Sequence, residues 1–546
     1  QNMHEISTQI VPFADFNKIR FVEGFDRIST EYPAYLTDES KLSPQPFDYL
    51  FFPVDEAELA AILTQMSAQK IKVTLAGART GLVGGCVPGK GALVSLENFD
   101  RIKSISWDAK AKEWRIQCQC ALDLRSLNEQ LVSKNLPDIA NCGDRQALDA
   151  LKRFKEDPAG YFYPPDPTEL SASIGGTVAT NASGARTYRY GPTRDWIRGI
   201  RVMLSNGEIL NIPRGKYFAS PAGKFSVFDS KGNELGVKLP TYRMPQTKNT
   251  AGFFAAPRMD LIDLFIGSEG CFGVITEVTA ALLKREEKIS VVQFLGSDEQ
   301  AIGLVDTLRN DERIQLDFLE FYSGNALDLL KQRQGQNPGS VEMPPIPEHA
   351  GAALFFEFSF EAMADNPDYG LLEKTISGCG ASIADSWAAY ENRELQRLKD
   401  FRHILPETIN AIVAERKKQH PQLHKLGTDL AVPDERLRDM WQIYCDALET
   451  ADLEWVAFGH IGNNHIHINI LPRNEIELQK GLALYEHFAA RAVEFGGTVS
   501  AEHGIGKMKI KFLELMYSPE HLNEMQAVKL ALDPGRMLNP GNIFYD

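Results

Sequence analysis

The sequence lacks an apolar run close to the ~18 residues that a membrane-spanning helix requires. It also lacks an excess of basic residues, because 73 Asp and Glu outnumber 58 Lys and Arg and give a net charge of −15. Such a charge disfavours general binding to nucleic acid or to anionic membranes. An anionic substrate would need a local cationic pocket. The start of the chain shows neither a basic segment nor an apolar one, so we expect no secretory signal.

Cysteine is scarce and scattered: the seven residues form neither a CxxC pair nor a spacing typical of iron–sulfur clusters. This usage favours free thiols in a reducing compartment. We therefore expect a cytoplasmic location, with peripheral contact to the inner membrane left open and no transmembrane segment. A GxGxxG signature after a strand is missing too, so a Rossmann-type nucleotide site is unsupported.

The length of 546 residues predicts at least two domains, since single cores stop growing at roughly 250–300 residues. Asp55 and Glu58 have the spacing of a capping box that opens a helix ending near Gln69. Expected strands cover residues 72–76, 92–96 and 114–120, and a hairpin turns at 206–207. A charged helical insert is expected at 143–160, an irregular excursion at 211–260, and long helices near 391–416 and 474–495. From about residue 290 the sequence alternates between expected strands and long helices, so we place the domain boundary near 285–290.

Three segments are rich in glycine and other small residues: 77–85, 164–184 and 267–276. Backbone N–H groups in such loops can cradle a pyrophosphate, and small residues leave room for a flat, extended ligand. A single segment of this kind would be read as an ordinary glycine-rich turn. Three of them in one chain favour a shared ligand site.

Five of the 11 histidines fall between residues 460 and 503. A two-residue turn at 463–464 would place His460 opposite His467 on neighbouring strands, where side chains approach to roughly 5 Å. Two imidazoles with the carboxylate of Glu502 form the pattern of a catalytic metal site. His503 could then act as a base. The alternative is that these histidines pack or form hydrogen bonds, and His465 is expected at the surface of the turn.

The three glycine-rich segments, in this order, resemble the FAD domain of the vanillyl-alcohol oxidase/PCMH superfamily. Residues 458–460 and 501–506 resemble the C-terminal domain of FAD-linked oxidases, as in D-lactate dehydrogenases, D-2-hydroxyglutarate dehydrogenases and glycolate oxidase flavoprotein subunits. The resemblance implies an α+β fold: a two-subdomain PCMH-type FAD-binding domain followed by a ferredoxin-like α+β substrate or cap domain. The implied division is an N-terminal extension (1–44), the FAD-binding domain (45–286) and the substrate and metal domain (287–546).

The resemblance also assigns roles to residues. His460, His467 and Glu502 match divalent-metal ligands, commonly of zinc or manganese, and His503 matches the catalytic base. Arg402 and Lys425 match residues that hold a substrate carboxylate. The matching FAD-binding residues are Gly77, Ala78, Arg79, Thr80, Gly81, Gly84, Pro165, Asp166, Ser173, Gly175, Gly176, Asn181, Gly184, Ile275 and Asn539. No His lies in residues 77–91 or 164–191, so the FAD is expected to be noncovalent.

The implied function is an FAD- and metal-dependent dehydrogenase that oxidises a D-2-hydroxy acid by hydride transfer to flavin N5. Electrons would pass to a quinone, a cytochrome or an electron-transfer flavoprotein. Two alternatives stay open: a flavoprotein oxidase of another alcohol, and a flavin-bearing electron-transfer subunit of a larger complex. A homodimer is also left open. The family usually has Asp-Gly-Asn where this chain has Asn463, Asn464 and His465, and the inserts at 143–160 and 211–260 are longer than usual.

Overall fold

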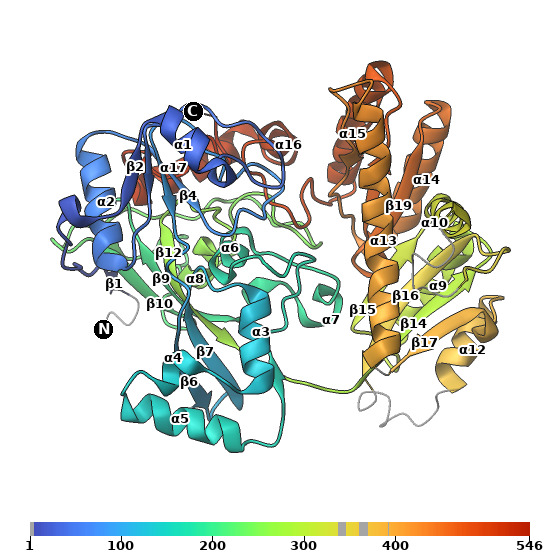
Figure 1. The fold of residues 1–546 in the computed structure, drawn as a ribbon, viewed down its shortest axis with the longest axis horizontal. Coiled ribbons are helices and arrows are strands. Elements are labelled where there is room, and N and C mark those ends of the chain that lie inside the picture. Colours follow the sequence, from blue (N-terminus) through green and yellow to red (C-terminus); the bar gives the residue numbers. More distant parts are fainter. Residues whose placement is uncertain (1–4, 337–344, 360–369, 391, 546) are drawn as a thin grey trace.

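The computed structural model describes residues 5–336, 345–359, 370–390 and 392–545, and Figure 1 shows them in two bodies. The first half of the chain builds the body that carries the N-terminus. An extended stretch after β13 (Leu283–Lys284) leads into the second body. Within the described residues, no helix combines the length and apolar character needed to cross a membrane.

The first sheet has the order β2-β3-β5-β4, with parallel pairing of β5 to both β3 and β4. Its strands are β2 (Phe21–Glu23), β3 (Tyr49–Phe51), β4 (Val73–Ala76) and β5 (Ala92–Ser95). Helix α1 (Phe25–Glu31) follows β2, and α2 (Glu56–Ala68) follows β3. The Asp55 carboxylate accepts a hydrogen bond from the Glu58 N–H at 2.9 Å, so the predicted helix start is confirmed.

The second sheet is antiparallel with the order β10-β9-β12-β7-β6. Its strands are β6 (Ile102–Asp108), β7 (Glu113–Gln119), β9 (Ile197–Met203), β10 (Ile209–Pro213) and β12 (Val274–Ala281). The accompanying helices are α3 (Leu124–Ser133), α4 (Pro137–Ala140), α5 (Arg145–Glu156), α6 (Ile174–Thr180) and α7 (Thr187–Tyr190). The predicted hairpin at 206–207 and the helical insert are confirmed.

The segment 211–260 is largely irregular, as predicted. Beyond the end of β10 it contains one short strand, β11 (Val227–Phe228), before α8 (Leu261–Phe265) begins. Strand β1 (Ile6–Ser7) pairs with β11 in parallel, and β8 (Tyr161–Phe162) pairs with β13. The excursion is therefore tied to the N-terminal end of the described chain.

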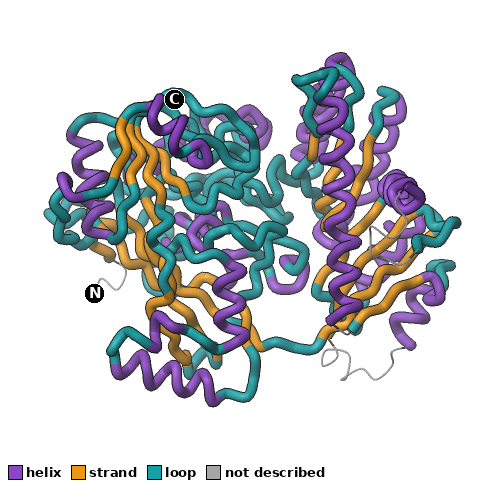
Figure 2. Tube along the Cα trace, viewed as in Figure 1, coloured by secondary structure: helices purple, strands orange, loops and turns teal. Residues whose placement is uncertain are grey.

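The second body is a seven-stranded sheet with the order β17-β14-β16-β15-β19-β20-β18. Its strands are β14 (Lys288–Leu295), β15 (Phe318–Tyr322), β16 (Ala352–Ser359), β17 (Ser386–Ala389), β18 (Leu426–Gly427), β19 (Trp455–His460) and β20 (His465–Ile470). Its helices are α9 (Asp298–Asn310), α10 (Gly324–Gln336), α12 (Gly370–Gly378), α13 (Asn392–Lys417), α14 (Leu437–Thr450) and α15 (Glu475–Glu494). Figure 2 shows the long helices beside these strands.

The end of the chain returns to the first body. Helices α16 (Ile510–Met516) and α17 (Pro519–Leu532) lie there in Figure 1. The Val73 N–H donates to the Met537 carbonyl at 2.8 Å, and the Asn539 N–H donates to the Val73 carbonyl at 2.7 Å. The division at 286–287 stays a prediction, and this return adds that residues far beyond 287 complete the first sheet. The α+β fold class is confirmed.

A partly buried ionic group links the two bodies. The Arg186 guanidinium donates to Asp166 Oδ2 at 3.0 Å and to Glu357 Oε1 of β16 at 2.8 Å. Glu357 also accepts a hydrogen bond from the Ser290 hydroxyl at 3.0 Å. The Glu357 side chain is 7% exposed, so its charge depends on this guanidinium for compensation.

Replacing Arg186 by Met should lower the free energy of unfolding by about 3 kcal/mol, because the nearly buried Glu357 and the partly buried Asp166 lose their shared cation. The melting temperature, followed by circular dichroism with saturating ligands, measures this loss. Arg27→Met is the control, since the Arg27–Glu31 pair is 59% and 48% exposed and should contribute little. Equal melting temperatures for the two variants would contradict the role given to Arg186.

Candidate active site

A cavity of about 350 Å³ extends from the loop after β4 to His467 in β20 of the second body. Ten of the residues expected to bind FAD line it: Gly77, Ala78, Arg79, Thr80, Gly81, Ser173, Gly175, Gly176, Ile275 and Asn539. His467, Glu502 and His503 line the same cavity. The structure therefore brings the glycine-rich segments and part of the histidine cluster to one space.

The loop after β4 offers hydrogen-bond donors to this cavity. Among the residues that the structure describes, none accepts a hydrogen bond from the backbone N–H groups of residues 78–81. Arg79 has a φ of 58°, and its guanidinium lies 4.3 Å from the centre of the Tyr35 ring. Unpaired N–H groups in a turn beside a cation suit the oxygens of a diphosphate. This donor set fits the diphosphate of FAD.

The remaining expected FAD residues are not part of the cavity lining: Gly84, Pro165, Asp166, Asn181 and Gly184. Asp166 is held by Arg186, as described above. Asn181 ends α6 with a φ of 48°, and its side-chain oxygen accepts a hydrogen bond from the Arg194 N–H at 2.9 Å. A Cβ on Gly184 would lie 1.9 Å from the Asp166 carbonyl oxygen, so only glycine allows this approach. These contacts support the cavity wall.

The histidine hairpin differs from its predicted register. His460 pairs with His465, and Phe458 pairs with His467, so the expected opposition of His460 and His467 is wrong. The reason is the turn, which is a 3-10 turn over Ile461–Asn463 closed by Asn464 at a φ of 53°. It uses four residues instead of two. The surface position expected for His465 is also wrong, because this residue is fully buried.

The longer turn gathers three imidazoles around Glu502. Ligand atoms of His460, His465, His467 and Glu502 all lie within 4.8 Å of one another. His460 Nε2 lies 3.1 Å from Glu502 Oε1, and His467 Nε2 lies 3.9 Å from Glu502 Oε2. His465 Nδ1 is buried without a hydrogen-bond partner. An orphaned buried nitrogen in such a donor set is what a divalent metal ion would satisfy.

The outer contacts of these histidines support the same interpretation. His460 Nδ1 lies 2.5 Å from the Glu320 carboxylate, and His467 Nδ1 donates to the Thr428 carbonyl at 2.8 Å. Each contact turns the Nε2 atom toward Glu502, as the second-sphere partners of metal-binding histidines do. Burial and neighbouring cationic groups lower the pKa of His465 to about 3, so its imidazole is neutral. Against the effect of burial, the carboxylates of Glu320 and Glu502 raise the pKa of His460 to about 9, so this imidazole would release a proton on binding a metal ion.

Asp429 organises the neighbouring loop. Its fully buried carboxylate accepts hydrogen bonds from the Lys509 ammonium at 2.8 Å and from the His503 N–H at 3.0 Å. His503 Nδ1 lies 3.5 Å from the same oxygen atom. Burial lowers the pKa of His503 to about 4, so this imidazole is neutral near pH 7.

The two residues expected to hold a substrate carboxylate lie outside the cavity lining. Arg402 is half-buried on α13, 5.8 Å from the centre of the Phe318 ring. Although burial opposes its ionisation, the cationic groups of His460 and Arg402 lower the pKa of Glu320 to about 2. Lys425 is exposed just before β18.

Three site residues escaped prediction. Asp429 lies within the stretch expected to bind a carboxylate, and its place beside Lys425 was the available signal. Lys248 belongs to the irregular excursion, and Glu320 lies on a strand of the other body; neither carries a local pattern. Lys248 forms an ion pair with Glu502 inside the cluster.

Two family models match the chain. The model described as FAD binding domain matches residues 47–144 and 153–213, and the gap between them falls in α5. The model described as FAD linked oxidases, C-terminal domain, matches residues 284–543. The predicted resemblance is confirmed.

Curated relatives match over nearly the full length. D-lactate dehydrogenase of Anaerostipes hadrus is 27% identical and covers 89% of this chain and 87% of its own length. Glycolate oxidase subunit GlcD of Bacillus subtilis is 26% identical, with coverage of 96% and 94%. D-2-hydroxyglutarate dehydrogenase of Stutzerimonas stutzeri is 27% identical, with coverage of 94% for both chains.

A solved structure of alkyldihydroxyacetonephosphate synthase superposes with a TM-score of 0.60 at 13% identity. The match covers 98% of this chain and 88% of that chain. At this identity the likeness supports the fold alone.

Glu269 connects the cavity to the loop that carries Glu502 and His503. Its nearly buried carboxylate lines the cavity and accepts hydrogen bonds from the N–H groups of Ile505 at 3.0 Å and Gly506 at 2.8 Å. Burial raises the pKa of Glu269 to about 7. Between its ordinary pKa and this value the folded chain binds more protons than the unfolded chain, so this group favours folding at low pH.

We therefore expect Glu269→Gln to gain stability relative to the unsubstituted chain as the pH rises from about 5 to 8. The unsubstituted chain loses the contribution of the neutral carboxyl over this range, whereas the amide does not titrate. Melting temperatures of both proteins at matched ligand saturation measure the difference. A difference that stays constant with pH would refute this assignment.

Proposed function

The chain belongs to the FAD-linked oxidases, and from this membership we propose that it is an FAD- and divalent-metal-dependent dehydrogenase of D-2-hydroxy acids. The substrate class is that of lactate, 2-hydroxyglutarate and glycolate, and the product is the 2-oxo acid. The observation that carries the proposal is the meeting of the cavity with the His460, His465, His467 and Glu502 cluster beside His503. The curated relatives named above support it.

Residues present in the chain fit both cofactors. The N–H groups of residues 78–81 and the small side chains of α6 would hold FAD without a covalent bond. His460, His467 and Glu502, joined by His465, would hold zinc or manganese. When bound, FAD supplies a hydride acceptor and the metal ion supplies Lewis acidity toward the substrate hydroxyl.

His503 is the proposed general base. Its Nδ1 faces Asp429, so Nε2 is the atom left to accept the hydroxyl proton of the substrate. The Asp429 carboxylate accepts hydrogen bonds from the backbone N–H groups of Glu502 and His503. These bonds keep the proposed metal ligand Glu502 and the proposed base His503 at a constant separation. Arg402 is the proposed partner of the substrate carboxylate, and the corresponding role of Lys425 stays a prediction.

Electrons would leave the flavin for an acceptor other than NAD, namely a quinone, a cytochrome or an electron-transfer flavoprotein. This part of the proposal rests on the resemblance and on the lack of a Rossmann signature in the sequence.

Anaerobic addition of a D-2-hydroxy acid should bleach the flavin absorbance of the purified protein, and removal of the metal by a chelator should prevent it. The panel comprises the D- and L-forms of lactate and 2-hydroxyglutarate, with glycolate as the achiral member. Bleaching by one D-acid and not by its mirror image supports the proposal. A flavin that none of these acids bleaches would contradict the proposed oxidation of a D-2-hydroxy acid.

His503→Ala should slow flavin reduction by about 10²- to 10⁴-fold, because the substrate hydroxyl loses its proton acceptor. Stopped-flow absorbance measures the rate, and the flavin-to-protein ratio shows whether FAD is still bound. His487→Ala is the matched control, since His487 is exposed on α15, and it should reduce at the original rate. Unchanged reduction in His503→Ala would remove this residue from the mechanism.

A further inference from the structure

The irregular excursion delivers a buried cation to the cluster. The Lys248 side chain is 2% exposed, and its ammonium forms an ion pair with Glu502 Oε1. It also lies 3.4 Å from the Gly184 carbonyl oxygen. The same Glu502 oxygen is 3.1 Å from His460 Nε2, so lysine and imidazole share one carboxylate.

The position of Lys248 is fixed by the two residues that follow it. The Thr250 N–H donates to the Ser500 carbonyl at 2.8 Å, and its hydroxyl accepts a hydrogen bond from the Gly504 N–H at 2.9 Å. The Asn249 side-chain oxygen accepts a hydrogen bond from the Thr498 hydroxyl at 2.5 Å. These bonds attach the excursion to the chain on both sides of Glu502. The Lys248 ammonium is therefore held within the cluster.

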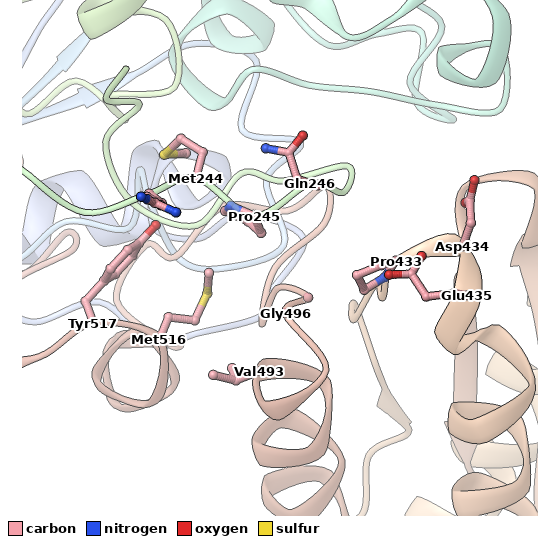
Figure 3. A pocket seen from close by; sticks show the side chains of 12 residues that line it. Met244, Pro245, Gln246, Pro433, Asp434, Glu435, Val493, Gly496, Met516 and Tyr517 are labelled. Carbon is pink, nitrogen blue, oxygen red and sulfur yellow. The ribbon is translucent and has the colours of Figure 1, made fainter. Parts of the chain in front are cut away.

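The residues before Lys248 meet a different environment. Arg243, Met244, Pro245 and Gln246 line an open cleft of about 570 Å³, together with Pro433–Glu435 and the ends of α15 and α16 (Figure 3). Within a few residues the chain passes from this open cleft to a buried position at Lys248. A solvent-exposed lysine could turn away when its partner is lost, whereas this one stays in the cluster.

A metal ion bound to Glu502 would compete with this ammonium. Glu502 carries one negative charge, which Lys248 and His460 compensate together. A divalent ion on the same carboxylate would stand next to a buried positive charge, which opposes its binding. An anionic ligand on the metal would supply the missing negative charge and accept the hydrogen bond that Glu502 gives up.

We infer that Lys248 is a positioning residue that makes metal binding and anion binding depend on each other. It weakens metal binding while the site holds no anion, and it donates to an anionic oxygen of the ligand once the metal occupies Glu502. This inference rests on the proposed metal site and goes beyond it by assigning a role to Lys248. The anion is a 2-hydroxy or 2-oxo carboxylate.

The test is the affinity of the FAD-bound protein for Mn²⁺, measured as free Mn²⁺ by electron paramagnetic resonance. Pyruvate, 2-oxoglutarate and glyoxylate serve as anions, because 2-oxo acids do not reduce an oxidised flavin. One of them should tighten Mn²⁺ binding to the unsubstituted chain. Lys248→Met should bind Mn²⁺ at least about tenfold more tightly without any acid, and the acid should no longer improve its affinity.

Two further variants complete the design. Lys248→Arg keeps the charge and should retain weak Mn²⁺ binding with a response to the acid. Lys511→Met removes an exposed lysine that pairs with Glu486 and should behave like the unsubstituted chain. The flavin-to-protein ratio shows that each variant is folded.

Unchanged or weaker Mn²⁺ binding in Lys248→Met would overturn the inference, as would an unsubstituted chain whose affinity responds to none of the three acids. If the unsubstituted chain binds no Mn²⁺ while a D-2-hydroxy acid still bleaches its flavin, the inference fails and hydroxy-acid oxidation stands. No turnover is needed to measure the affinity, so the two failures are distinguishable.

Discussion

The ionised carboxylate of Glu502 is the group on which the site depends. It is nearly buried, and burial opposes its charge, yet His460 and Lys248 hold its pKa well below the usual range. A buried charge of this kind is stable only when its partners are all in place. Those partners come from the excursion before α8 and from the hairpin of the second body. The ionisation of one side chain thus requires the two bodies to be assembled.

The C-terminal segment, which returns to the first body, also helps to hold the two bodies together. Asn539 donates to the Glu269 carbonyl at 3.0 Å and accepts from the Leu75 N–H at 2.8 Å, so the C-terminal segment joins two walls of the flavin cavity. Glu269 in turn holds the loop after His503. The cavity and the histidine cluster therefore share supports, which gives a physical reason why a substrate held at the cluster would meet a flavin in fixed geometry.

Local patterns account for the elements that were predicted. The capping residue Asp55, the turn at 206–207 and the helical insert all depend on near neighbours in the chain, so their signals are readable in short windows. The hairpin register was not readable in this way. Asn463 and Asn464 are compatible with a two-residue turn, but the chain forms a 3-10 turn, which moves His465 inward and gives the cluster a third imidazole.

The sequence by itself determined the α+β class, the glycine-rich segments of the flavin cavity and the identity of His460, His467, Glu502 and His503 as one chemical set. The fold class follows from the resemblance of these segments to FAD-linked oxidases. The grouping of the side chains follows from residue type and position in the chain, which folding does not alter. Only the tertiary structure decided that Lys248, Glu320 and Asp429 complete the set, because their partners lie at least 70 residues away in the chain. A buried charge is compensated here by residues from distant segments, and the spacing of residues along the chain does not predict such contacts.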